Sequence, residues 1–93
     1  MCLEKFRSQI DKIDSKIVKL LNQRAELALR ISELKAKEQL PVFDSEREQK
    51  IFEKLCSENS GPLSNESIMK IYLSIIQESR ALQAKNILRQ SEG

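Results

Sequence analysis

The most regular feature of the chain is a row of apolar positions in its first 37 residues, where hydrophobic side chains recur in alternating steps of three and four. That spacing keeps side chains on one face of an α-helix. No Gly or Pro interrupts the stretch, so the pattern predicts one long helix over residues 3–37. The row consists of Leu3, Phe6, Ile10, Ile13, Ile17, Leu20, Arg24, Leu27, Ile31 and Leu34.

Two further helices follow the first breaker, Pro41. Asp44 or Ser45 is a candidate N-cap, and residues 45–48 fit the capping-box pattern, so we expect a short helix that runs to about Glu58. An Asn-Ser-Gly-Pro cluster ends it. A third helix then begins at Ser64 or Asn65, and residues 89–93 are expected to fray. The fold class is therefore all-α, with one long, one short and one medium helix.

The length of the first helix bears on assembly. About 35 helical residues span roughly 50 Å, whereas a compact chain of this size is only about 30 Å across. The far half of the helix would expose its apolar row unless a partner chain covered it. We therefore expect residues 1–93 to form a single helical domain in an intertwined two-fold homodimer.

Composition narrows the possible chemistry. The chain has no His and only two Cys, which excludes Ser-His and Cys-His nucleophilic sites and His-ligated zinc, and we expect no metal. With 16 Lys and Arg against 14 Asp and Glu, the net charge of +2 favours neither nucleic acid nor a membrane surface as partner. The N-terminus carries no apolar signal core, so we expect a reducing, cytoplasmic location. Any chemistry must use Arg, Lys, carboxylate, amide or hydroxyl groups.

Four polar residues interrupt the apolar faces. Arg24 occupies a position of the row where the period calls for Leu or Ile, and Lys35 lies about 20° from its direction and roughly 16 Å further along the axis. On the third helix, Ser79 and Gln83 are four apart on the apolar face. An ion pair could explain Arg24, and packing could explain Ser79 or Gln83 singly. Together they predict a polar pocket inside a helical bundle.

Three charged residues, Asp44, Arg47 and Glu48, stand at the start of the second helix, where free backbone N–H groups can bind a hydroxyl or an anion. Helix capping explains them equally well. Arg7 could pair with Asp11 on the surface, and it lies about 25 Å along the helix from Arg24. One chain cannot readily bring both arginines to one ligand, but an antiparallel dimer can supply Arg7 to the pocket of its partner.

Five sequence blocks, in this order and spacing, resemble the all-helical class of chorismate mutase. They are RSQIDKID at residues 7–14, LLNQR at 20–24, ISELK at 31–35, PVFDSERE at 41–48 and IIQESRALQ at 75–83. The resemblance covers residues 3–88. It implies an isomerase that converts chorismate to prephenate in aromatic amino acid (Phe and Tyr) biosynthesis, by an intramolecular Claisen rearrangement that needs no cofactor, metal or nucleophile.

The resemblance also implies a role for each candidate residue. Those expected to bind the substrate are Arg7, Arg24, Lys35, Asp44, Arg47, Glu48, Ser79 and Gln83, and those expected to be catalytic are Lys35, Gln83, Arg24 and Glu48. The family pattern assigns the carboxylates to Arg24, Ser79 and the opposite protomer's Arg7. It assigns Lys35 to both a carboxylate and the ether oxygen, and Gln83 to the ether oxygen. It assigns the ring hydroxyl to Glu48 and the backbone around Asp44, and makes Arg47 a cation of the pocket wall.

Two other functions stay open at this point. Isochorismate-pyruvate lyases, which this sequence also resembles, share the three-helix dimer and use a similar carboxylate clamp. In a non-catalytic helical dimerisation module, Arg24 would instead form a buried ion pair. The intact pair Lys35 and Gln83 and the block at residues 41–48 favour the mutase. With no room for a second domain, we expect a stand-alone enzyme or one that works in complex with a separate protein.

Overall fold

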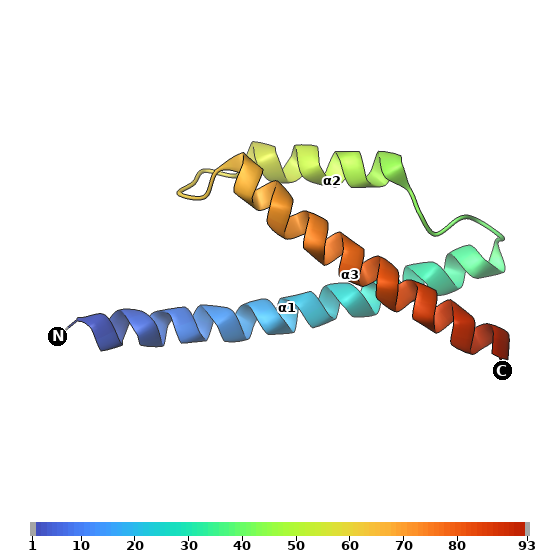
Figure 1. Ribbon diagram of the computed structural model, residues 1–93, viewed down its shortest axis with the longest axis horizontal. Coiled ribbons are helices and arrows are strands. Elements are labelled where there is room, and N and C mark those ends of the chain that lie inside the picture. The colour runs from blue at the N-terminus through green and yellow to red at the C-terminus, as the bar shows by residue number, and fades with distance from the viewer. Residues whose placement is uncertain (1, 93) are drawn as a thin grey trace.

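The computed structural model describes residues 2–92, with side chains described through residue 89. It contains three helices and, within that range, no strand: α1 (Leu3–Lys37), α2 (Ser45–Glu58) and α3 (Asn65–Glu92) (Figure 1). The all-α prediction and the bounds of the first two helices are confirmed. Helix α3 continues to Glu92, and Gly93 lies outside the described residues; the fraying expected for residues 89–93 stays a prediction.

The end of α1 turns the chain toward α2. Gln39 adopts φ 58°, in the left-handed region, and the Leu40 amide donates to the Lys35 carbonyl at 2.8 Å. This closes the last turn and satisfies a carbonyl at the helix end. The following segment then leads into α2, which lies above α1 in Figure 1.

Asp44 is the N-cap of α2. Its Oδ1 accepts a hydrogen bond from the Arg47 backbone N–H at 3.0 Å. The capping box expected for residues 45–48 is wrong, because the Glu48 side chain does not return to the helix N-terminus but binds Arg80 on α3. With Asp44 as the N-cap, the third helical residue is Arg47, so Glu48 is out of register for a capping box and reaches across to α3 instead.

The turn before α3 is organised by Asn59. Its Nδ2 donates to the Leu63 carbonyl and to Asn65 Oδ1, both at 2.8 Å, while its Oδ1 accepts from the Gly61 N–H. Gly61 has φ 82°, a conformation that glycine adopts without a steric penalty. Ser64 caps the new helix by accepting from the Ser67 N–H at 3.1 Å. The connection between α2 and α3 is thus fixed by its own hydrogen bonds.

Helix α3 is the element on which both α1 and α2 pack, and it crosses α1 in that helix's C-terminal half (Figure 1). The N-terminal half of α1 projects away from the other two helices. The chain measures 56 × 29 × 15 Å, with a radius of gyration of 16.7 Å. A compact globule of the same length would have a radius of gyration of about 12 Å. As expected, the first helix overshoots its own domain.

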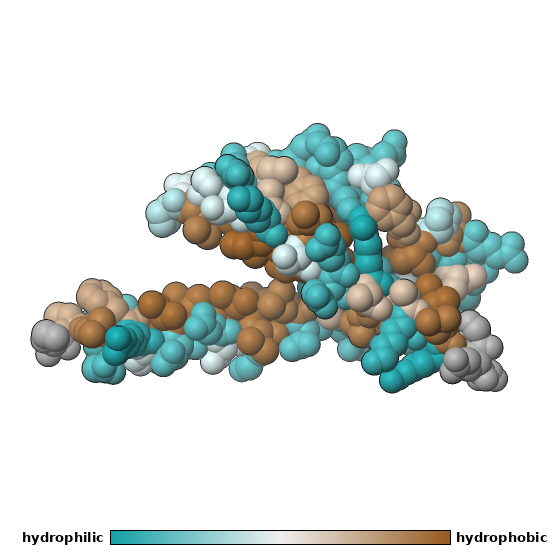
Figure 2. Space-filling view, viewed as in Figure 1, coloured by the Kyte–Doolittle hydropathy of each residue, from teal (hydrophilic) through white to brown (hydrophobic). Residues whose placement is uncertain are grey.

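Very little of the described chain is buried. Only Ser32 and Ile76 have less than a tenth of their surface exposed, at 0% and 5%. Ser32 satisfies its hydroxyl by donating to the Leu29 carbonyl at 2.7 Å. The apolar row of α1 is exposed at every hydrophobic position: Leu3, Phe6, Ile10, Ile13, Ile17, Leu20, Leu27, Ile31 and Leu34. Figure 2 shows hydrophobic side chains along the projecting half of α1, on the side that faces α2 and α3.

Within the described residues, no helix combines the length and apolar character needed to cross a membrane.

Candidate functional site

A cavity of about 290 Å³ opens where the three helices meet. Seven of the eight residues expected to bind the substrate line it, from all three helices and from the segment that precedes α2. They are Arg24, Lys35, Asp44, Arg47, Glu48, Ser79 and Gln83. The apolar part of the wall includes Leu27, Ile31, Val42, Phe43, Ile51 and Ile76. The structure therefore brings the interruptions of the apolar pattern to one place.

Arg24 and Ser79 meet across the contact between α1 and α3. An Arg24 Nη1 donates to Ser79 Oγ at 3.0 Å, although the two residues are 55 apart in the sequence. Both side chains are half-buried. No carboxylate of the described residues lies within ion-pair distance of Arg24. The structure therefore does not show an ion pair of Arg24 within its own chain, and among the described residues the guanidinium, which lines the cavity, has no carboxylate partner.

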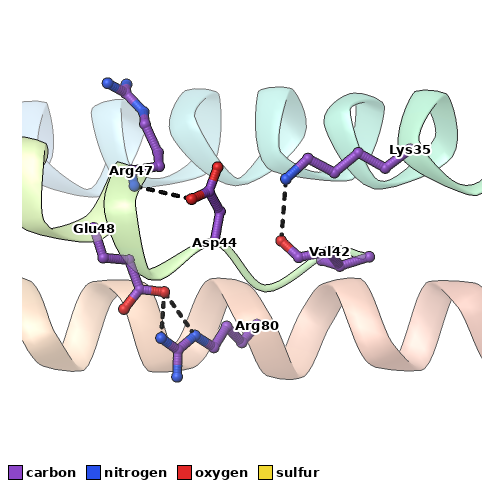
Figure 3. Close-up of polar contacts among 6 residues, drawn as sticks. All are labelled: Lys35, Val42, Asp44, Arg47, Glu48 and Arg80. Carbon is purple, nitrogen blue, oxygen red and sulfur yellow. Dashed lines mark hydrogen bonds and ion pairs between the residues drawn. The ribbon is translucent and has the colours of Figure 1, made fainter. Parts of the chain in front are cut away.

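Gln83 and Lys35 both donate to backbone carbonyls. Gln83 Nε2 lies 2.7 Å from the Ala28 carbonyl on α1, and Lys35 Nζ lies 3.2 Å from the Val42 carbonyl (Figure 3). Because only the nitrogen of an amide can donate, the Ala28 carbonyl fixes which end of Gln83 faces α1. The second N–H of Gln83 and the further N–H groups of Lys35 stay available to a ligand.

Residues at the start of α2 line the cavity, and one of them, Asp44, also caps the helix. Oδ1 of Asp44 accepts the capping hydrogen bond from the Arg47 N–H, so the capping interpretation is confirmed for this residue. In Figure 3 the Arg47 side chain extends away from Asp44, and it forms no ion pair within the described residues. Asp44 and Arg47 are mostly exposed, whereas Glu48 is half-buried.

Arg80 is a residue of the cavity wall that the sequence analysis missed. Its Nε donates to Glu48 Oε2 at 3.0 Å and its Nη2 contacts the same oxygen. Its guanidinium also lies 4.2 Å from the centre of the Phe43 ring, a cation–π distance. The hydrogen bond with Glu48 raises the pKa of Arg80 above its usual value. A signal was present, because Arg80 is four residues after the buried Ile76 and three before Gln83.

Arg7 is the one expected site residue that does not reach the cavity. It pairs with Glu4 at 3.2 Å on the surface, and its side chain is 64% exposed. The alternative surface pair with Asp11 is not formed, since the partner of Arg7 is three residues before it rather than four after it. Arg7 and Arg24 are 17 residues apart on the same helix, which separates them by about 25 Å.

The charge of the cavity favours an anion. Arg24, Lys35, Arg47 and Arg80 line it together with only two carboxylates, those of Asp44 and Glu48. The lining therefore carries an excess of two positive charges, which complements a dianion. No group of three or more Cys, Asp or Glu side chains that could hold a metal ion is found among the described residues.

Two relatives are similar in sequence to most of the chain. A bifunctional chorismate mutase/prephenate dehydratase of Aquifex aeolicus is 42% identical over 87 residues, which are 89% of this chain and 24% of that protein. A chorismate mutase of Methanocaldococcus jannaschii is 39% identical over 85 residues, or 87% of this chain and 83% of that protein. The chain thus spans about a quarter of the bifunctional relative and most of the shorter one.

A similar fold has been solved in the chorismate mutase of Helicobacter pylori, in complex with prephenate. The match has a TM-score of 0.83 at 30% identity and covers 91% of this chain and 92% of that one. Residues 6–84, which include all eight expected site residues, match the family described as chorismate mutase type II. Sequence, fold and the lining of the cavity agree, and the chain belongs to the type II chorismate mutase family.

Proposed function

We propose that the chain is a chorismate mutase, an isomerase that converts chorismate to prephenate in aromatic amino acid biosynthesis. The observation that carries this proposal is the single cavity in which seven expected residues meet with an excess of two positive charges. The chorismate mutase of M. jannaschii and the H. pylori enzyme in complex with prephenate support it.

The proposed reaction is an intramolecular Claisen rearrangement, in which one C–O bond of the substrate breaks while a C–C bond forms. No nucleophile, cofactor or metal takes part, so the protein acts by holding the dianion in a compact geometry and stabilising the charge that develops. Arg24 is suited to clamp one carboxylate, because its guanidinium is already oriented by Ser79. Arg47, which lines the same cavity from α2, adds to the positive field.

Lys35 and Gln83 are the proposed donors to the ether oxygen. Negative charge grows on this oxygen as the C–O bond breaks, and donors that are already in place need no reorganisation. The contact between Gln83 Nε2 and the Ala28 carbonyl keeps the amide oriented with its second N–H free. Glu48 and the backbone near Asp44 are the proposed partners of the ring hydroxyl.

A homodimer completes the proposal. Arg7 lies too far from Arg24 to serve the cavity of its own chain, and the helix that carries it exposes its apolar row. A two-fold partner packed against the projecting half of α1 would cover that row and bring the partner's arginine to the cavity. Residues 1–93 would then form one domain of an intertwined dimer with two equivalent sites.

Complementation between two inactive variants would test the proposed dimer. The variants Arg7→Ala and Arg24→Ala are each expected to be inactive, and mixing them under conditions of subunit exchange should restore activity. Half of the mixed chains form heterodimers at equilibrium, and one of the two sites in each heterodimer has both arginines. Restoration of about a quarter of the wild-type sites is expected by this counting. If exchange is demonstrated by mass spectrometry and activity stays absent, Arg7 does not act across the interface.

The proposal includes a cytoplasmic location and a small-molecule partner. Cys2 and Cys56 are both free thiols, which suits the reducing cytoplasm. We propose the dianion chorismate as its small-molecule partner, with no nucleic acid or membrane involved.

In the deciding experiment, purified protein is added to chorismate and the loss of chorismate absorbance is measured. The product is identified by chromatography. Saturable formation of prephenate is expected. Lys35→Ala should abolish most of it, while Lys37→Ala, an exposed lysine at the end of the same helix, should not. Inertness toward chorismate combined with release of pyruvate from isochorismate would refute the mutase and identify a lyase.

A further inference from the structure

We infer that Arg80 is a positioning residue for Glu48: it binds one carboxylate oxygen and leaves the other free to accept a hydrogen bond from a hydroxyl group of the ligand. This inference rests on the proposed function, because it names the group that prepares the hydroxyl-binding part of the same cavity. Arg80 itself is not assigned to contact the substrate.

The geometry of the pair supports this role. An arginine commonly binds a carboxylate with two parallel hydrogen bonds, one to each oxygen. Here Nε and Nη2 of Arg80 both reach Oε2 of Glu48, as the two dashed lines in Figure 3 show. Oε1 has no hydrogen-bond partner in the part of the chain that the structure describes. One oxygen is therefore anchored and the other is available at the cavity wall.

Arg80 is itself held in place by one further contact besides Glu48. Its guanidinium lies over the Phe43 ring, which belongs to the segment before α2, and Glu48 lies in the first turns of α2. The side chain is 39% exposed and that of Glu48 is 19% exposed, so the pair is partly shielded from water. A glutamate without this partner would sample several rotamers. Arg80 thus joins three segments and selects one orientation of the carboxylate.

Charge compensation gives the same pair a second effect. An uncompensated carboxylate in the cavity would repel a dianionic ligand, and repulsion grows where water is excluded. The guanidinium of Arg80 offsets the charge of Glu48 directly. The site can therefore present a strong hydroxyl acceptor while the cavity as a whole still attracts anions.

The test compares two inhibitors in one set of variants. The probes are a dianionic bicyclic ether with the ring hydroxyl and its deoxy counterpart, and calorimetry measures their dissociation constants. Arg80→Ala should weaken binding of both dianionic probes, because the charge of Glu48 is then uncompensated, and it should weaken binding of the hydroxylated probe by roughly a further 10- to 100-fold, as expected for a misplaced acceptor. Arg80→Lys keeps a charge but lacks the planar fork, so it should not restore the preference for the hydroxyl.

A double-mutant cycle separates positioning from a structural role. In the Glu48→Ala background, Arg80→Ala should change kcat/KM for chorismate less than about twofold, because no carboxylate remains to be positioned. Lys70→Ala is the matched control, since it removes an exposed cation and its ion pair with Glu66 from the same helix. Melting temperatures of all variants identify any that fail to fold.

Two results would overturn the inference while the proposed function stands: equal losses for the two probes in Arg80→Ala, or additive losses in the cycle. Failure of the wild-type protein both to bind either probe and to convert chorismate would instead overturn the proposed function, and this inference with it.

Discussion

Replacing Gln83 with glutamate should make turnover depend on pH. Gln83 donates to the Ala28 carbonyl at 2.7 Å, and a glutamate in this position would place a carboxyl oxygen against the carbonyl oxygen. Only the protonated acid can donate to the carbonyl or to the ether oxygen of the substrate. The two carboxylates of bound chorismate neutralise the cationic excess of the cavity, so in the complex the contact with Ala28 favours the protonated form.

The size of the effect follows from the lost hydrogen bond. Leaving a buried acceptor facing another acceptor costs about 1–3 kcal/mol, and one pKa unit corresponds to about 1.4 kcal/mol. The introduced glutamate should therefore titrate about one to two units above the ordinary value of roughly 4.3. At pH 7.5 the protonated fraction would be about 0.6–6%, and kcat would lie about 15- to 160-fold below its acid plateau.

The assay measures kcat at saturating chorismate between pH 4.5 and 8.5, because kcat reports ionisations in the substrate complex. The wild-type profile should be flat through neutrality, since an amide does not titrate. Gln77→Glu introduces the same group at an exposed position of the same helix and should also be flat. A flat profile for Gln83→Glu at near-normal kcat would refute the role of Gln83 as a donor to the reacting oxygen.

Three further predictions follow from the same geometry. Lys35→Ala and Gln83→Ala should each lower kcat by about 10²–10³-fold with the fold intact, as judged by circular dichroism, because each removes a donor to the developing charge; a loss of less than tenfold would contradict the assignment. Ile10→Asp places a charge in the exposed row of α1 and should shift the dimer toward monomer in sedimentation velocity, with loss of activity; an unchanged dimer would contradict the proposed interface. Asp44→Ala removes the cap that accepts from the Arg47 N–H and should lower the free energy of unfolding by about 1 kcal/mol in urea, whereas Asp44→Ser should recover most of it.

The bounds of the helices could be predicted from the sequence because residues close to each helix end determine where the helix begins and ends. Leu3 to Lys37 contains no Gly or Pro and follows one period, and the structure has α1 over the same residues. Asp44 and Ser64 cap their helices through contacts within three residues. Glu48 shows where local reasoning fails: the capping-box pattern was present, but Arg80, 32 residues away, binds its carboxylate instead.

The cavity was predictable to the extent that its residues break a pattern. Arg24, Ser79 and Gln83 stand on faces that are otherwise apolar, and the contact of α1 with α3 brings them together. Arg80 shares a helix face with Ile76 and Gln83, but it directly follows Ser79, and a charged residue at such a position is also typical of a solvated face, so periodicity alone did not single it out. Its partners, Glu48 and Phe43, become visible only when α2 and α3 are placed in space.

Arg7 connects the site to the assembly. The half of α1 that carries it also carries most of the exposed apolar row, so in the proposed dimer one partner surface would contribute to both the core and the cavity. A dianion held between Arg24 of one chain and the partner's arginine then contributes to association as well as to catalysis. By mass action, a ligand at 100 times its dissociation constant stabilises the state that binds it by about 2.7 kcal/mol per site. Substrate binding and dimer stability are therefore two measurements of one linked equilibrium, and a change in the row of α1 must alter both.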